Sequence, residues 1–101
     1  MPVTFTRAGR TMTALISGEI DHHGAREIMT ALDREIDATL PHLLELDLSG
    51  VTFMDSSGIA ILLRARRRLD ELEGRLVVRS IPAQPRKVLD AAGVGRIISL
   101  Q

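Results

Sequence analysis

The segment LLELDLSGVTFMDSSGIAILL, residues 43–63, joins a pattern typical of a strand to one typical of a helix. Its first half alternates leucines with Glu45 and Asp47, and this period of two predicts a central strand covered mainly on one face. We expect that strand to end near Val51 and TFMDSSG, residues 52–58, to form the loop before a helix. A strand that leads directly into a helix in the middle of the chain favours an α/β fold.

The residues before this segment predict a hairpin and the best-defined helix of the chain. Near period-two alternation in residues 3–7 and 11–17, interrupted at residues 8–10, predicts two strands at one edge of the sheet. Asp21 is placed to cap a following helix, which Pro41 ends. Apolar residues recur in that helix at spacings of three and four, as expected of one buried stripe. They are Ala25, Ile28, Met29, Leu32, Ile36 and Leu40.

The second predicted helix starts near Ser56 and runs to about Leu72. Gly74 is placed to end it in a left-handed turn, because glycine adopts that conformation without steric conflict. The residues expected to be buried are Ile59, Leu62, Leu63, Leu69 and Leu72.

Four arginines of this helix lie in the run RARRR, residues 64–68. Such a run is compatible with a surface for phosphate or nucleic acid. However, acidic residues lie four positions after Arg66 and Arg67, a spacing at which opposite charges pair weakly on a helix. The expected pairs are Arg66 with Asp70 and Arg67 with Glu71. We therefore expect a solvated helix face.

The remaining residues predict a short strand at 75–80, a helix near 83–92 ended by Gly93, and a strand or extended tail at 96–100. No linker, repeat or low-complexity segment divides the sequence. We expect one α/β domain over residues 1–101, in which helices pack on a mixed sheet in the order β-β-α-β-α-β-α-β.

Composition excludes several classes of function. At 101 residues, with 45% hydrophobic and 26% charged residues, the chain is ordinary for one globular domain. No apolar stretch approaches the ~20 residues that cross a bilayer, and the first residues lack the pattern of a secretory signal. We therefore expect no membrane insertion and a cytoplasmic location. Without cysteine, the chain has neither disulfides nor thiolate metal ligands.

Nucleic acid is not an expected partner. Thirteen basic and thirteen acidic residues cancel, so the net charge gives no general attraction to phosphate. The only aromatic residues are Phe5 and Phe53, so base stacking is poorly supported.

Asp55, Ser56 and Ser57 are three successive residues of types that commonly cap helices. One of them is enough for capping, so at least one hydroxyl is left for another role. Gly58 keeps the adjacent surface low enough for another protein to approach. Simple capping and a functional hydroxyl both remain open from spacing alone. A phosphate at this position would meet the positive end of the helix dipole, so modification would leave the fold standing.

Other chemistries fit these serines poorly. A hydrolase serine requires the G-x-S-x-G turn, which is absent, and the only histidines available as a base are His22, His23 and His42. A phosphate-binding loop requires several glycines and a lysine, whereas the single lysine is Lys87 in the last predicted helix. The neighbouring His22 and His23 point about 100° apart on a helix and therefore converge poorly on a metal. We expect no metal or cofactor and no catalysis, and we retain these two histidines as interface candidates.

Three segments resemble the STAS domain family of anti-sigma factor antagonists. LLELDLSGVTFMDSSGIAILL is similar to the family signature, in which a strand ending in D-L-S-G precedes F-M-D-S-S-G at a helix start. ISGEIDHHGAREI, residues 16–28, is similar to the G-E-L-D-H-H-T-A segment of sporulation members. VLDAAGVGRIISL, residues 88–100, is similar to the family's L-F-D-x-S-G-L-x-K-I-I ending.

The resemblance implies a partner-switching cycle. An unphosphorylated antagonist binds an anti-sigma factor that is itself a serine kinase, which releases a sigma factor, here in a sporulation sigma-F pathway. Phosphorylation by that kinase ends the interaction, and a PP2C-type phosphatase restores it. A free member of this kind is expected to be a monomer. The alternative is a STAS module that is never phosphorylated and docks within a transport or stress-sensing complex.

The resemblance also implies roles for individual residues. The phosphate acceptor is the first serine after the aspartate, Ser56. The expected partner-binding residues are Asp21, His22, His23, Asp55, Ser57 and Gly58. Among these, Asp55 helps to orient or recognise the acceptor, and Asp21 is also the obvious cap of the first helix.

Overall fold

A mixed five-stranded sheet organises the computed structural model, which describes residues 2–101. The strands are β1 (Val3–Ala8), β2 (Thr11–Ile20), β3 (Leu43–Met54), β4 (Arg75–Arg79) and β5 (Ser99–Leu100), and they lie in the order β1-β2-β3-β4-β5. The helices are α1 (His22–Thr39), α2 (Ser56–Glu71) and α3 (Ala83–Ala91), and a short 3-10 helix spans Val94–Arg96. β1 is antiparallel to β2 and the other pairs are parallel, which confirms the predicted fold class and element order.

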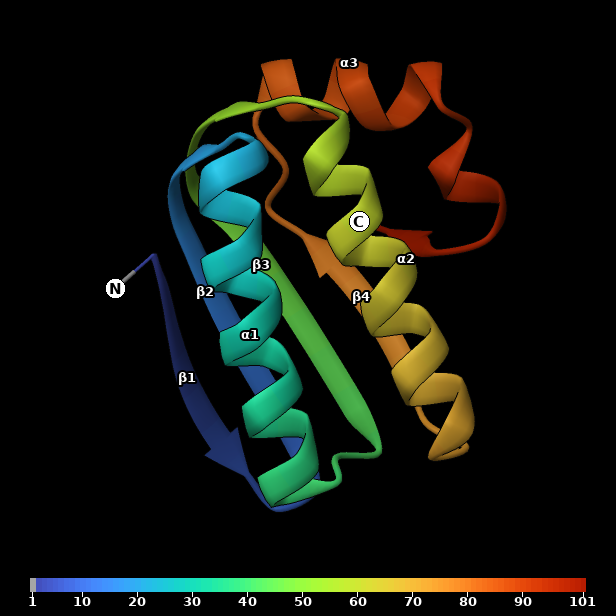
Figure 1. The fold of residues 1–101 in the computed structure, drawn as a ribbon. Coiled ribbons are helices and arrows are strands. Elements are labelled where there is room, and N and C mark those ends of the chain that lie inside the picture. Colours follow the sequence, from blue (N-terminus) through green and yellow to red (C-terminus); the bar gives the residue numbers. More distant parts are fainter. Residues whose placement is uncertain (1) are drawn as a thin grey trace.

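The helices α1 and α2 lie side by side on one face of the sheet, and α3 lies at the end where β3 finishes (Figure 1). The leucines of β3 that alternate toward the helices, Leu44, Leu46 and Leu48, are fully buried. Glu45 and Asp47 point to the opposite face and are only partly covered. The prediction of a strand covered mainly on one face is confirmed. Within residues 2–101, none of the helices combines the length and the apolarity that crossing a bilayer requires.

Charged side chains cover part of the second face of the sheet. Arg79 of β4 lies 3.4 Å from a carboxylate oxygen of Glu45 and 3.8 Å from one of Asp47. Burial alone would raise the pKa of Asp47, but the Ser49 backbone N–H at 2.9 Å and the charge of Arg79 outweigh that effect and lower the pKa. Because the pKa of Asp47 is lower in the folded than in the unfolded chain, its carboxylate stabilises the fold at any pH above the unfolded-state pKa. This stabilisation is lost as the pH falls through the folded-state pKa.

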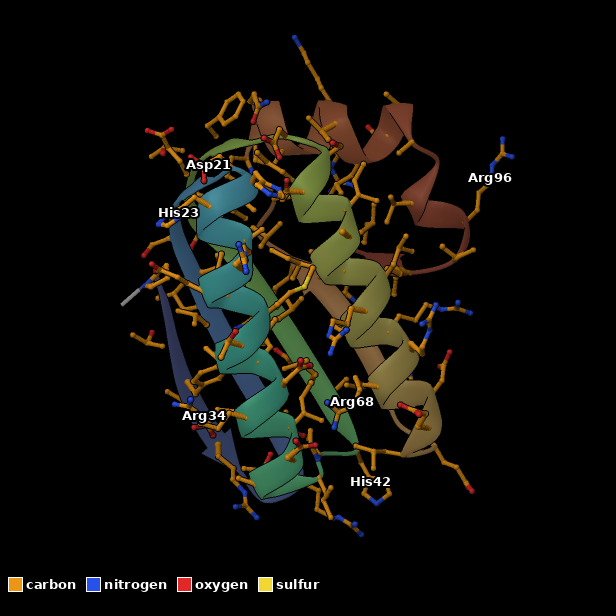
Figure 2. All side chains as sticks on the ribbon, in the orientation of Figure 1. Asp21, His23, Arg34, His42, Arg68 and Arg96 are labelled. Carbon is orange, nitrogen blue, oxygen red and sulfur yellow. The ribbon has the colours of Figure 1, made fainter. Side chains whose placement is uncertain are left out.

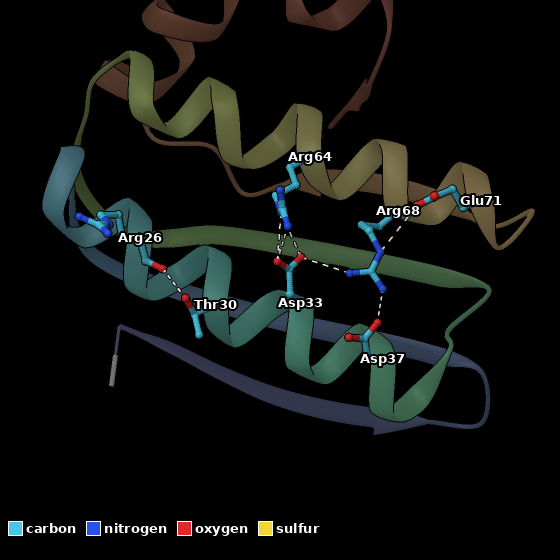
Figure 3. Close-up of polar contacts among 7 residues, drawn as sticks. All are labelled: Arg26, Thr30, Asp33, Asp37, Arg64, Arg68 and Glu71. Atoms are coloured by element: carbon cyan, nitrogen blue, oxygen red, sulfur yellow. Dashed lines mark hydrogen bonds and ion pairs between the residues drawn. The ribbon is translucent and has the colours of Figure 1, made fainter.

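Ion pairs between helices replace part of the expected solvated arginine face (Figure 3). Arg64 of α2 contacts Asp33 of α1 at 2.8 Å, and Arg68 contacts the same carboxylate at 3.3 Å. Arg68 also pairs with Asp37 of α1. The run of arginines is therefore not simply solvated, because two of its members tie α2 to α1.

The two ion pairs expected within α2 have different outcomes. Arg66 lies 3.8 Å from Asp70, as predicted. Glu71 pairs with Arg68 at 3.8 Å and not with Arg67, so the second predicted pair is wrong. Arg68 and Glu71 are three residues apart, which also places neighbours on one helix face, and Arg68 pairs with Asp33 and Asp37 of α1 as well.

Two details of α2 differ from the sequence expectation. Leu63 is 41% exposed, while Ile61 is buried, because the buried stripe is rotated relative to the predicted one. The residue in the left-handed conformation after the helix is Glu73, with φ of 57°, and not Gly74. Gly74 instead lies against the backbone of His42, where an added Cβ would come within 2.6 Å of the carbonyl oxygen. Its small size is required by close packing rather than by a turn.

Candidate functional site

Two parallel strands end side by side, and each leads directly into a helix through one aspartate. Ile20, the last residue of β2, is the register partner of Met54, the last residue of β3. Asp21 follows the first and Asp55 follows the second, and the Asp55 N–H donates to the Ile20 carbonyl oxygen at 3.1 Å. The starts of α1 and α2 therefore meet at the carboxyl edge of the sheet (Figure 1), where functional sites of α/β folds commonly lie.

Both aspartates are helix caps. The Gly24 N–H donates to Asp21 Oδ1 at 2.7 Å, and the Ser57 N–H donates to Asp55 Oδ1 at 2.7 Å. A side-chain oxygen at this position satisfies one of the backbone donors that the first helical turn leaves unpaired. The predicted cap of α1 is confirmed, and the cap of α2 is the aspartate and not a serine.

The predicted loop TFMDSSG is wrong in its extent, since β3 continues to Met54 and only Asp55 separates it from α2. Between the pairs Leu15–Asp47 and Ile20–Met54, β3 advances seven residues while β2 advances five, with irregular register at two places. Such bulges bend a strand and re-aim its side chains. They also break the period-two pattern, which is why the alternation stops near Val51 although the strand does not.

Ser56 is exposed and Ser57 is half-buried at the start of α2. Because Asp55 supplies the capping oxygen, neither hydroxyl is needed for that purpose. Within residues 2–101, no hydrogen bond engages the Ser56 hydroxyl. The hydroxyl of Ser56, the expected phosphate acceptor, is thus exposed at the positive end of a helix and next to the Asp55 carboxylate.

Gly58 has a packing role that the sequence did not reveal. It is buried against Met54, and an added Cβ would come within 2.6 to 2.9 Å of the Met54 Cγ, Sδ and Cε atoms. The absence of a side chain therefore lets the first turn of α2 sit directly on the end of β3. The small size of Gly58 therefore determines how closely Ser56 and Ser57 approach the end of β3.

The other predicted partner-binding residues lie at the start of α1. Asp21, His22 and His23 are all exposed, and Figure 2 shows Asp21 and His23 at one end of the molecule and His42 at the other. His23 lies 3.8 Å from Glu27. The part of the chain that the structure describes contains no group of three histidine, aspartate or glutamate side chains arranged to hold a metal.

Sequence reasoning missed two residues of this site. Phe53 is 41% exposed next to the serine segment, whereas the other aromatic, Phe5, packs against the core. Gln84, at the start of α3, forms two hydrogen bonds with the backbone of Met54. The position of Phe53 beside the motif is a signal that could have been used. Gln84 lies thirty positions after Met54, and no local pattern in the sequence links the two.

Comparisons with known proteins agree with one another. The family model described as STAS domain matches residues 3–101. The anti-sigma F factor antagonist of Lysinibacillus sphaericus is 31% identical over 85 residues, covering 84% of this chain and 73% of that relative. The anti-sigma F factor antagonist of Paenibacillus polymyxa is 27% identical with the same coverage. Among solved structures, the anti-sigma factor antagonist SpoIIAA in its unphosphorylated form matches with a TM-score of 0.84 and 25% identity, over 98% of this chain and 87% of that one.

Proposed function

This chain belongs to the STAS domain family, and we propose that it is an anti-anti-sigma factor whose binding is switched off by phosphorylation of Ser56. The observation that carries the proposal is that the capping side chain of α2 is Asp55 and not one of the two serines. Asp55 caps the helix, which leaves the exposed Ser56 hydroxyl without a structural task.

We propose that the partner is an anti-sigma factor that is also a serine kinase, and that a PP2C-type phosphatase reverses the modification. The names of the two relatives support a sigma-F pathway and thus a role in sporulation, in the bacterial cytoplasm. The existence of SpoIIAA in a form described as unphosphorylated supports control by phosphate. In this role the chain is a binding protein and not an enzyme.

The proposed docking surface surrounds the acceptor. It combines the exposed start of α1 with the serine segment, because the ends of β2 and β3 bring the two together. Its members are Asp21, His22, His23, Phe53, Asp55 and Ser57, with Gly58 beneath them. An exposed aromatic ring beside polar groups is typical of the residues that dominate binding energy at protein interfaces.

Electrostatics explain how one phosphate can end binding without unfolding the protein. A phosphoserine at Ser56 would carry a charge of roughly −1.5 to −2 next to the Asp55 carboxylate. The dipole at the start of α2 stabilises that charge within the free protein. A partner covering the same surface would instead have to remove water from two adjacent negative groups, which is unfavourable unless it offers matching cations.

Mapping of phosphate after incubation with ATP and the cognate anti-sigma factor kinase tests the proposal. We expect mass spectrometry to find one phosphate on the wild-type chain, at Ser56, and none on Ser56→Ala. Ser57→Ala is the matched control and is expected to be phosphorylated normally. A wild-type chain that binds its partner but never gains phosphate would contradict the switch and favour a docking subunit of a transport or stress-sensing complex.

Replacing the exposed aromatic ring should weaken docking selectively. We expect Phe53→Ala to reduce affinity for the kinase by about thirtyfold, since truncation of a residue that dominates an interface costs about 2 kcal/mol or more. Leu15→Ala is the matched control, because Leu15 is also 41% exposed and lies in the neighbouring strand β2. Titration calorimetry would measure both affinities. Equal affinities for the two variants would remove Phe53 from the proposed surface.

A further inference from the structure

The side chain of Gln84 lies beside the part of β3 that has no neighbouring strand on the β4 side. β4 pairs with β3 only from Leu43–Arg75 to Asp47–Arg79, so the second half of β3 extends beyond its partner on that side. Backbone groups at the end of a strand need other partners when no strand continues beside them. At Met54, the side chain of Gln84, in the first turn of α3, supplies one partner for the backbone N–H and one for the carbonyl oxygen.

The side-chain amide of Gln84 forms two hydrogen bonds with Met54 of the kind that the backbone of a neighbouring strand would form. Its Oε1 atom accepts a hydrogen bond from the Met54 N–H at 2.8 Å, and its Nε2 atom donates one to the Met54 carbonyl oxygen at 2.8 Å. These two backbone groups fix the orientation of the amide, because only one arrangement matches donor with acceptor. On the opposite side, the Asp55 N–H bonds to the Ile20 carbonyl oxygen. The peptide units just before Ser56 are therefore held from both sides.

This clamp, the pair of hydrogen bonds between Gln84 and the Met54 backbone, follows a stretch of β3 whose pairing with β2 is irregular. β3 reaches Met54 through two register irregularities, and bulged strands lose part of their ladder of hydrogen bonds. Ser56 is only two residues beyond Met54, and Gly58 rests directly on the Met54 side chain. A shift of the Met54 backbone would consequently move the start of α2 and the acceptor hydroxyl with it.

We infer that Gln84 is a positioning residue for phosphorylation of Ser56, an inference that rests on the proposed function. Phosphoryl transfer depends on alignment of the attacking oxygen, and a misplacement of about 1 Å is enough to lower a rate by orders of magnitude. Gln84 touches neither the serine nor the incoming phosphate. It acts through the backbone of Met54, and it thereby makes the geometry of the acceptor dependent on the position of α3.

Gln84→Met tests the inference, because methionine has a similar shape but cannot form either hydrogen bond. In the full chain we expect amide hydrogen exchange at Met54 to accelerate by about tenfold or more, as lost protection requires. With the kinase that phosphorylates the wild-type chain, we expect kcat to fall by about tenfold and KM to stay within about twofold, since docking residues are unchanged.

Val88→Ala is the control for a general weakening of α3. Val88 lies on the same helix and packs against the core, but its side chain has no hydrogen-bonding atom, so its truncation removes no hydrogen bond to the Met54 backbone. It should lower the melting temperature without changing Met54 exchange or kcat. Equal loss of kcat in both variants, or an unchanged kcat in Gln84→Met, would overturn the inference. A wild-type chain that the kinase never phosphorylates would instead refute the proposed function, and the exchange rate at Met54 would still report whether the clamp exists.

Discussion

Ser56→Asp is expected to bind the anti-sigma factor kinase at least about 100-fold more weakly than the wild-type chain while keeping its melting temperature within a few degrees. Loss of affinity of this size corresponds to about 3 kcal/mol, within the range for an unmatched charge buried in an interface. Stability should be preserved because Ser56 is exposed and a negative charge at a helix start is favourable. Calorimetric titration and thermal unfolding of the same samples measure the two effects.

A matched variant separates the position of the charge from the charge itself. Thr6→Asp also adds one carboxylate at an exposed residue, but in the edge strand β1. It should bind the kinase with an affinity close to that of the wild-type chain. The switch is contradicted if Ser56→Asp binds as tightly as Thr6→Asp. A large drop in melting temperature for Ser56→Asp would show that the serine serves the fold.

Gly74→Ala is expected to destabilise the fold by about 2 kcal/mol, in the range for an atom forced into a packed interior. An added Cβ would lie 2.6 Å from the His42 carbonyl oxygen and 2.9 Å from Leu69 Cδ1. Relief by a side-chain movement alone is blocked, because the His42 oxygen is backbone and accepts a hydrogen bond from the Arg75 N–H at 2.8 Å. The clash therefore falls where β4 joins β3.

Thermal and urea unfolding would measure this loss, which should lower the melting temperature by roughly 10 °C for a domain of this size. Gly95→Ala is the control, since its added Cβ would meet only Leu100 Cδ1, at 3.6 Å, which is ordinary contact. It should unfold within about 2 °C of the wild-type chain, as most exposed substitutions do. Similar melting temperatures for the two variants would show that the backbone around His42 yields easily.

Local patterns in the sequence predicted the elements well, because each of them rests on residues close together in the chain. The alternating leucines of β3, the α1 stripe from Ala25 to Ile36 and the cap at Asp21 are of this kind and are confirmed. Leu40 was wrongly predicted to belong to the stripe: it is 53% exposed, because the helix ends at Thr39 and Leu40 turns into the left-handed conformation. Errors arose where distant residues decide the outcome. The bulges that extend β3 to Met54 follow from pairing with β2, and the role of Gly74 follows from contact with His42.

The candidate site shows the same division. The motif identified Asp55 and Ser56 as neighbours at a helix start, and the structure assigns the capping role to the aspartate. Gln84 could not be predicted, because its side chain meets Met54 only after α3 has packed across the end of the sheet. The ion pairs of Arg64 and Arg68 with Asp33 of α1 could not be predicted for a similar reason, since helical spacing describes only pairs within one helix.

The repeated unit of strand, aspartate and helix at the carboxyl edge has a consequence for bacteria that hold several related switches. One copy of the unit carries Ser56, the proposed phosphate acceptor, and the other presents Asp21, His22 and His23 with no serine at the matching position. If the proposed function holds, changes in the second copy would alter which kinase recognises the chain and leave phosphorylation at the first copy intact. Parallel signalling circuits built on this fold would then diverge in their choice of partner while sharing one mechanism of inactivation.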